Sequence, residues 1–114
     1  AVGEVADGTT RRFTLTPRDL GFATARPEDL AGADPAGAAR EALRILGGAP
    51  GPRRDMVLAN AAAGVWAAGK ADTIVDGVPL AAEAIDSGRA LDRLRALVAA
   101  TGGELAKVEA HGRA

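Results

Sequence analysis

The chain contains no cysteine and only one histidine, His111, among its 114 residues. Without cysteine it can form no disulfide, offer no thiolate nucleophile and build no zinc–thiolate site. One histidine cannot supply the several imidazoles of a histidine-rich metal site. The sequence gives no serine a partner residue that could act as its general base, which argues against a hydrolytic triad.

Aromatic residues are also few, at 3% of the chain, so the predicted core is aliphatic and rich in alanine. The apolar fraction of 47% and the charged fraction of 25% are those of an ordinary globular protein. Fourteen basic residues face 15 acidic ones, for a net charge of −1. Nucleic-acid binding needs a basic excess, so no nucleic-acid partner is predicted.

No segment of the sequence has the pattern of a membrane span or a signal peptide. The longest apolar stretch, residues 56–68, is interrupted by Asn60 and Gly64 and is shorter than the roughly 20 residues that a span requires. The start of the chain lacks the basic and then apolar layout of a signal peptide. We therefore expect a cytoplasmic protein without membrane contact. Because the chain opens with Ala1, we also expect a processed chain or a piece of a longer one.

The first 34 residues predict a β-hairpin followed by a helical turn and a connector. Asp7-Gly8 is a favoured pair for a tight hairpin turn, and apolar residues alternate with polar ones over residues 11–16. Thr16 and Pro17 are typical of a helix start, and Gly21 should end that turn. Residues 22–34 are expected to be a connector.

About four helices are predicted after the connector, because glycine and proline separate segments with apolar residues at helical spacing. They are expected over residues 35–46, 53–68, from about Pro79 to 86, and 89–100, the last capped by Ser87. The predicted elements are therefore a β-hairpin followed by about four α-helices. Residues 104–114 are expected to form a loose C-terminal tail.

The helix expected over residues 53–68 is apolar on nearly every face. Such a helix is normally buried on all sides. A chain of 114 residues does not obviously supply enough partners, so structure outside this chain is expected to cover part of the helix. Alone, the chain should leave a face of this helix exposed.

Most carboxylates stand near turns or helix starts, where capping is the expected role. Only the adjacent pair Glu28-Asp29 has a possible magnesium role, and we predict that it caps a surface turn instead. The glycine-rich loop over residues 47–54 could cradle a phosphate, with two arginines behind it. It lacks the Lys-Ser/Thr of a P-loop and follows a helix, so helix termination is predicted.

Asn60 is the notable polar residue, because it lies inside the most apolar helix. We predict that its amide is buried and ties a neighbouring loop or helix end in place; the alternative is contact with a ligand. Trp66 is predicted to fill the core, and His111 to lie in the tail. No catalytic, substrate-binding or metal residue is assigned to this chain.

Five segments in order resemble the anthranilate phosphoribosyltransferase family. They are FTLTPRDLGF (13–22), AREALRILGG (39–48), GPRRDMVLANAA (51–62), DGVPLA (76–81) and IDSGRA (85–90). Each is weak alone, but their order and short spacings make the resemblance specific. It covers only the C-terminal portion of the family's sequence, and Pro79 departs from the family pattern. The resemblance implies an α/β fold class overall, with residues 1–103 as the C-terminal part of a phosphoribosyltransferase α/β domain and 104–114 as a tail.

This resemblance implies a glycosyltransferase that moves a phosphoribosyl group from phosphoribosyl pyrophosphate to anthranilate in tryptophan biosynthesis. The intact enzyme would use Mg²⁺ and form a homodimer. The family's pyrophosphate loop, anthranilate contacts and magnesium-binding acids precede the portion that this chain resembles, so this segment is expected to bind no Mg²⁺. Its partner would be the rest of the enzyme chain, and alone it should be inactive.

Two alternatives remain at this point. One is a non-enzymatic helical module whose apolar helix binds a partner. The other is a fragment of a nucleoside phosphorylase of the same superfamily.

Overall fold

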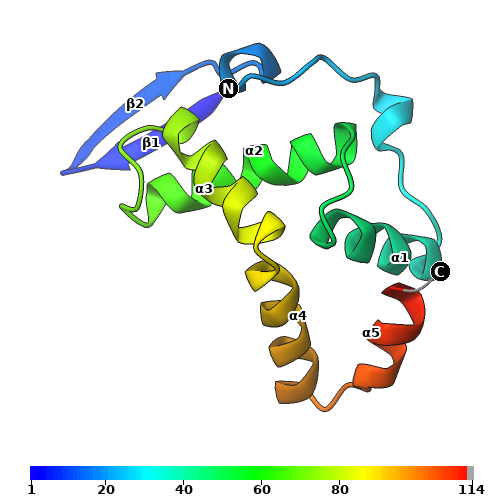
Figure 1. Ribbon diagram of the computed structural model, residues 1–114. Helices are drawn as coiled ribbons and strands as arrows, with labels where there is room; N and C mark the ends of the chain where they lie inside the picture. Colours follow the sequence, from blue (N-terminus) through cyan, green and yellow to red (C-terminus); the bar gives the residue numbers. More distant parts are fainter. Residues whose placement is uncertain (113–114) are drawn as a thin grey trace.

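The computed structural model describes residues 1–112, which fold into an antiparallel hairpin, two single-turn 3-10 helices and five α-helices (Figure 1). The mixed α/β class and the hairpin-then-helices order are therefore confirmed. In chain order the elements are β1 (Val2–Ala6), β2 (Thr9–Phe13), η1 (Pro17–Leu20), η2 (Pro27–Leu30), α1 (Pro35–Leu46), α2 (Pro52–Ala67), α3 (Ile74–Asp86), α4 (Arg89–Ala100) and α5 (Leu105–Gly112).

The hairpin forms at the predicted turn. Asp7 and Gly8 both have positive φ, at 49° and 73°, as a type I′ turn requires. The register pairs Val2 with Phe13 and Ala6 with Thr9. The second strand ends at Phe13, earlier than expected, and Thr16 then caps η1. The hairpin stands at one end of the molecule, above the crossing of α2 and α3 (Figure 1).

Helices α2 and α3 cross at the centre of the fold (Figure 1). Ala62 of α2 is completely buried at this crossing, against Gly77 of α3. The main buried cluster lies nearby and joins three helices through Ile45, Leu58, Ala81 and Ile85. The relative position of α1, α2 and α3 is thus set by small and aliphatic side chains, as the composition predicted.

The prediction that a helix restarts near Pro79 was wrong, because α3 begins at Ile74 and runs through the proline. The Thr73 side chain caps the helix by accepting a hydrogen bond from the backbone N–H of Asp76 at 3.1 Å. Pro79 removes the bond that a backbone N–H at this position would give to the carbonyl of Val75. Both residues are exposed, so solvent can reach that carbonyl.

The predicted cap of the last long helix was also wrong in detail. Because α3 extends to Asp86, Ser87 becomes its C-cap, and its N–H donates to the Glu83 carbonyl at 2.9 Å. Gly88 caps α4 instead, with φ at 82°. A left-handed conformation of this kind costs glycine nothing.

The loose tail predicted over residues 104–114 is contradicted for residues 105–112, which form α5. This helix lies beside α1 and α4. Leu105, Val108 and His111 recur every three residues and so lie along one side of it, and an ion pair of 3.1 Å joins Arg95 of α4 to Glu109. The remainder of the predicted tail, residues 113–114, lies outside the described residues.

Burial of α2 is one-sided. Leu58 and Ala62 are buried, whereas Met56 is 44% exposed and Asn60, Ala61 and Gly64 are exposed. The chain alone therefore leaves a face of this helix uncovered, as expected from its all-round apolar pattern. None of the helices within residues 1–112 has the length and apolarity to cross a bilayer.

Candidate functional site

The acidic pair Glu28-Asp29 is used for local structure. Asp29 accepts hydrogen bonds from the backbone N–H of Arg26 at 3.0 Å and from its guanidinium at 3.1 Å, which closes η2. The predicted capping role is confirmed. Within residues 1–112 no three acidic or histidine side chains form a group that could hold a metal ion.

Hydrogen bonds to their carboxylates hold the pKa values of Asp29 and Asp19 below the ordinary 3.8. The hydrogen bond from the Arg26 side chain lowers the pKa of Asp29 most, and the bond from the Arg26 backbone N–H lowers it further. The Thr16 side chain and then the Thr16 backbone N–H lower the pKa of Asp19 in the same way. A carboxyl whose pKa is lower in the folded state stabilises that state above 3.8, and the contribution is lost as the pH falls through the lowered value.

A carbon-13 NMR titration of the side-chain carboxyls measures both pKa values. Arg26→Ala should move the pKa of Asp29 back toward 3.8 and leave that of Asp19 unchanged. An Asp29 pKa at or above 3.8 in the unmodified chain would contradict this assignment.

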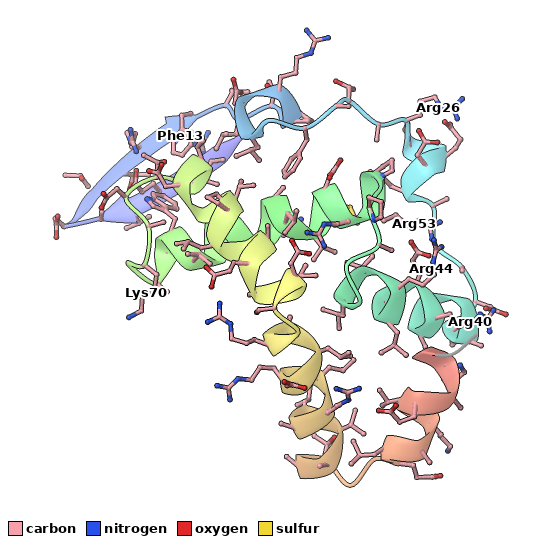
Figure 2. All side chains as sticks on the ribbon, viewed as in Figure 1. Phe13, Arg26, Arg40, Arg44, Arg53 and Lys70 are labelled. Carbon is pink, nitrogen blue, oxygen red and sulfur yellow. The ribbon has the colours of Figure 1, made fainter. Side chains whose placement is uncertain are left out.

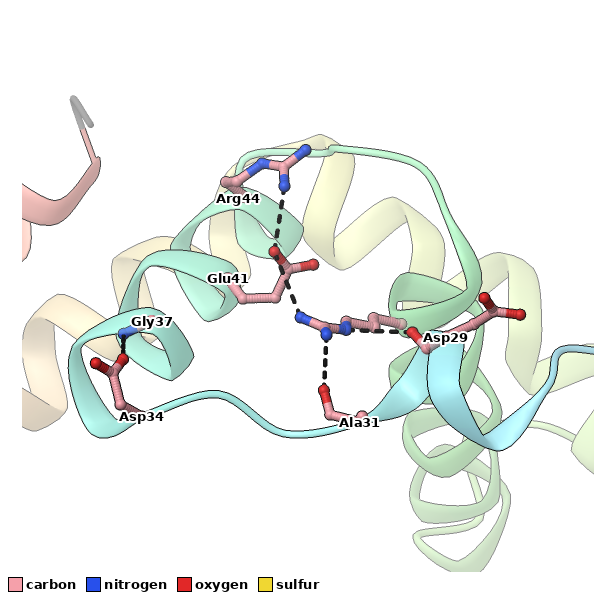
Figure 3. Close-up of polar contacts among 7 residues, drawn as sticks. Asp29, Ala31, Asp34, Gly37, Glu41 and Arg44 are labelled. Carbon is pink, nitrogen blue, oxygen red and sulfur yellow. Dashed lines mark hydrogen bonds and ion pairs between the residues drawn. The ribbon is translucent and has the colours of Figure 1, made fainter.

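The arginines of the loop over residues 47–54 are held by internal partners. The Arg53 guanidinium lies 3.8 Å from the carboxylate of Glu41, which also accepts a hydrogen bond of 3.2 Å from Arg44 of the preceding helix α1. Figure 3 labels Glu41 and Arg44 and marks the contact between them. Arg53 also donates to the carbonyls of Ala31, at 2.6 Å, and Asp29, at 3.3 Å. It thereby joins the η2–α1 connector to the first turn of α2.

Arg54 joins the first turn of α2 to the end of α3. One of its guanidinium nitrogens lies 2.8 Å and 2.9 Å from the two carboxylate oxygens of Asp86. Gly47 caps α1, and Gly51, with φ at 136°, precedes α2. The loop is thus a junction between helices, which confirms its predicted terminating role, and it offers no free arginine for a phosphate.

Four labelled arginines, Arg26, Arg40, Arg44 and Arg53, lie at the end of the molecule formed by η2 and α1, as Figure 2 shows. Carboxylates on the same elements pair three of them: Asp29 with Arg26, and Glu41 with Arg44 and Arg53. Sequence reasoning missed this network. The signal for it in the sequence is a set of acidic residues between positions 28 and 41, followed by Arg53 and Arg54 at the start of a predicted helix.

The prediction for Asn60 was wrong. Its side chain is exposed, and its Nδ2 donates to the Met56 carbonyl at 2.8 Å, one turn earlier in the same helix. The buried environment was expected because the surrounding sequence is apolar, but this face of α2 has no cover. Trp66 is half-buried and lines a hollow of about 230 Å³ beneath the hairpin, with Phe13 and Leu15. His111 is half-buried in α5.

Two adjoining apolar hollows flank the first half of α2, and both are lined by Leu30 and Met56. One, of about 370 Å³, lies between α1 and α2. The other, of about 290 Å³, lies between α2 and the η1–η2 segment. The described residues thus bring together an apolar groove and structural ion pairs.

Comparison with known proteins gives a consistent result. A sequence model described as "Glycosyl transferase family, a/b domain" matches residues 1–91. The chain is 46% identical over 109 residues to an anthranilate phosphoribosyltransferase of Methanococcoides burtonii, covering 96% of this chain and 31% of that protein. The corresponding protein of Caulobacter vibrioides is 51% identical over 104 residues, covering 91% and 30%.

A third relative, an anthranilate phosphoribosyltransferase of Geobacter sulfurreducens, is 55% identical over 95 residues, covering 83% of this chain and 27% of that protein. The chain therefore spans less than a third of the length of these curated relatives. No solved structure matches it.

Proposed function

Because the chain belongs to the glycosyl transferase family, in its a/b domain, we propose that it is the C-terminal segment of an anthranilate phosphoribosyltransferase. The observation that carries this proposal is identity of 46–55% over most of the chain to three enzymes of that name. These names favour it over the nucleoside phosphorylase alternative.

The residues that carry the resemblance also form the centre of this fold. Residues 51–62 include the first turns of α2, and residues 76–90 include most of α3. These are the two helices that cross at Ala62 and Gly77 and that Arg54 joins to Asp86. The resemblance therefore falls on one packed unit and supports a structural role for this segment.

In the intact enzyme, the proposed reaction is displacement at the anomeric carbon of phosphoribosyl pyrophosphate. The anthranilate amine forms the new carbon–nitrogen bond while the bond from carbon to the pyrophosphate oxygen breaks, and the amine then loses a proton. Mg²⁺ is the proposed cofactor, held by residues outside this chain, and it would neutralise charge on the departing pyrophosphate.

This segment acts as a scaffold in that proposal, and its partner is the rest of the enzyme chain. A homodimer is proposed for the intact protein, without nucleic-acid or membrane partners. A cytoplasmic location is proposed as well, since a highly charged sugar pyrophosphate does not cross a bilayer unaided.

A chimera tests the proposal. The matched segment of the Caulobacter vibrioides enzyme is replaced by the corresponding residues of this chain, and consumption of anthranilate is measured with phosphoribosyl pyrophosphate and magnesium. We expect activity within about tenfold of the parent, because a scaffold leaves the reacting groups in place. A folded chimera that consumes no anthranilate would contradict the proposal. The parent enzyme is the positive control.

A further inference from the structure

We propose that the two hollows around Met56 form one docking groove for the part of the enzyme that lies outside this chain's match to its relatives. We call it the Met56 groove and define it by Leu20, Phe22, Leu30, Leu46, Met56 and Val57. The inference rests on the proposed function and deepens it, because it names the surface through which the scaffold engages the rest of the enzyme.

The groove has the chemistry of a protein–protein contact. Its walls come from three places: the η1–η2 segment, α1 and the first half of α2. Met56 is 44% exposed where the two hollows adjoin. Apolar pockets that accept an anchoring side chain from a partner are typical of the energetic centre of an interface.

The charges beside the groove are satisfied locally. Arg53 and Glu41, which line the first hollow, face each other at 3.8 Å. Asp55 lines the second hollow and stands in the first turn of α2, where the helix dipole favours a carboxylate. A groove without a free cation has little to offer a phosphate, so an uncharged apolar protein segment is the occupant that fits.

The part of the relatives that this chain does not match is the source of such a segment. The match to the Methanococcoides burtonii enzyme covers 96% of this chain but only 31% of that protein, which leaves about 69% (100 minus 31) outside it. A second copy of this chain fits less well. A two-fold interface presents the same patch from both sides, and two concave grooves facing each other leave a void.

A single cysteine at position 56 measures whether the groove is covered, because the chain has no cysteine of its own. Met56→Cys is prepared in the 114-residue chain and in the Caulobacter chimera. Both are labelled with iodoacetamide, and mass spectrometry reads the label on the peptide that carries position 56. Leu97→Cys is the matched control, since Leu97 is an exposed apolar residue of α4 outside the groove.

We expect labelling at position 56 to be at least tenfold slower in the chimera than in the 114-residue chain, and labelling at position 97 to be equal in both. Equal labelling at position 56 in an active chimera would overturn the groove proposal and leave the proposed function standing. Protection in a folded but inactive chimera would support the groove and overturn the proposed function. Protection in the 114-residue chain that grows with protein concentration would overturn the proposal in favour of a second copy.

Discussion

Gly77→Ala is expected to destabilise the fold by about 3 kcal/mol, because the added methyl group has no room at the crossing of α2 and α3. A Cβ atom at position 77 would lie 2.5 Å from the Ala62 carbonyl oxygen, 3.0 Å from its Cα and 3.1 Å from its carbonyl carbon. These are backbone atoms of α2, so no side-chain rotation relieves the overlap. The two helices would have to move apart, opening the buried cluster beside them. The better helix propensity of alanine recovers only about 1 kcal/mol.

Gly64→Ala is the matched control. Gly64 lies inside α2 and is exposed, and a Cβ atom there would meet nothing within 4 Å. Alanine should therefore stabilise the chain by about 0.5–1 kcal/mol, by reducing the freedom of the unfolded state. Urea unfolding followed by circular dichroism measures both variants. Shifts in the same direction would show that the close approach at Ala62 does not control the packing of α2 on α3.

Asp86→Ala is expected to lower the free energy of unfolding by about 2–3 kcal/mol. The Arg54 side chain is only 11% exposed, and Asp86 is its ion-pair partner at 2.8 Å. Another nitrogen of the same guanidinium, Nη1, is buried without a hydrogen-bond partner among residues 1–112. Removing Asp86 would leave the whole guanidinium uncompensated. We expect a loss of stability below the largest values known for broken buried ion pairs, because the Asp86 side chain is 55% exposed.

Two further variants isolate the cause. Arg54→Met combined with Asp86→Ala should recover at least half of the lost stability, because no buried charge then remains. Glu83→Ala breaks the exposed Glu83–Arg89 pair in the same part of the chain and should change the stability by less than about 0.5 kcal/mol. If Asp86→Ala is as mild as Glu83→Ala, the pair with Arg54 contributes no more than a surface contact.

Local signals predicted much of the fold. Asp7-Gly8 specified the hairpin turn, Asp34-Pro35 the start of α1, Gly47-Gly48 its end, and residues 89–100 the extent of α4. These signals are local: glycine and proline act through their backbone preferences, Asp34 caps α1 with its side chain, and the apolar spacing of 89–100 is that of a helix, so all are readable without tertiary context.

The failures arose where two signals competed. Pro79 indicated a helix start, whereas the Thr73 side chain, six residues earlier in the chain, caps α3 and fixes its start. The proline lies on an exposed face of the helix, where the carbonyl that loses its hydrogen bond can reach solvent. The short helix α5 was missed because α1, α4 and the Arg95–Glu109 pair support it. Eight residues form a stable helix only with such packing.

The features of the candidate site were harder to predict from the sequence than the helices and strands. The sequence showed that α2 is apolar all round, but it could not show which face the chain itself covers. The residues that define the Met56 groove extend from 20 to 57 in the chain, so the groove exists only after α1 and the η1–η2 segment fold against α2. The pairing of Arg54 with Asp86, 32 residues apart, likewise depends on the crossing of α2 and α3.

The most direct test of the scaffold role compares the purified 114-residue chain with the chimera in one anthranilate-consumption assay containing phosphoribosyl pyrophosphate and magnesium. The scaffold role predicts turnover by the chimera and none above background by the chain alone, since the match covers only 30% of the enzyme in which the chimera is built. Turnover by the 114-residue chain itself would contradict it.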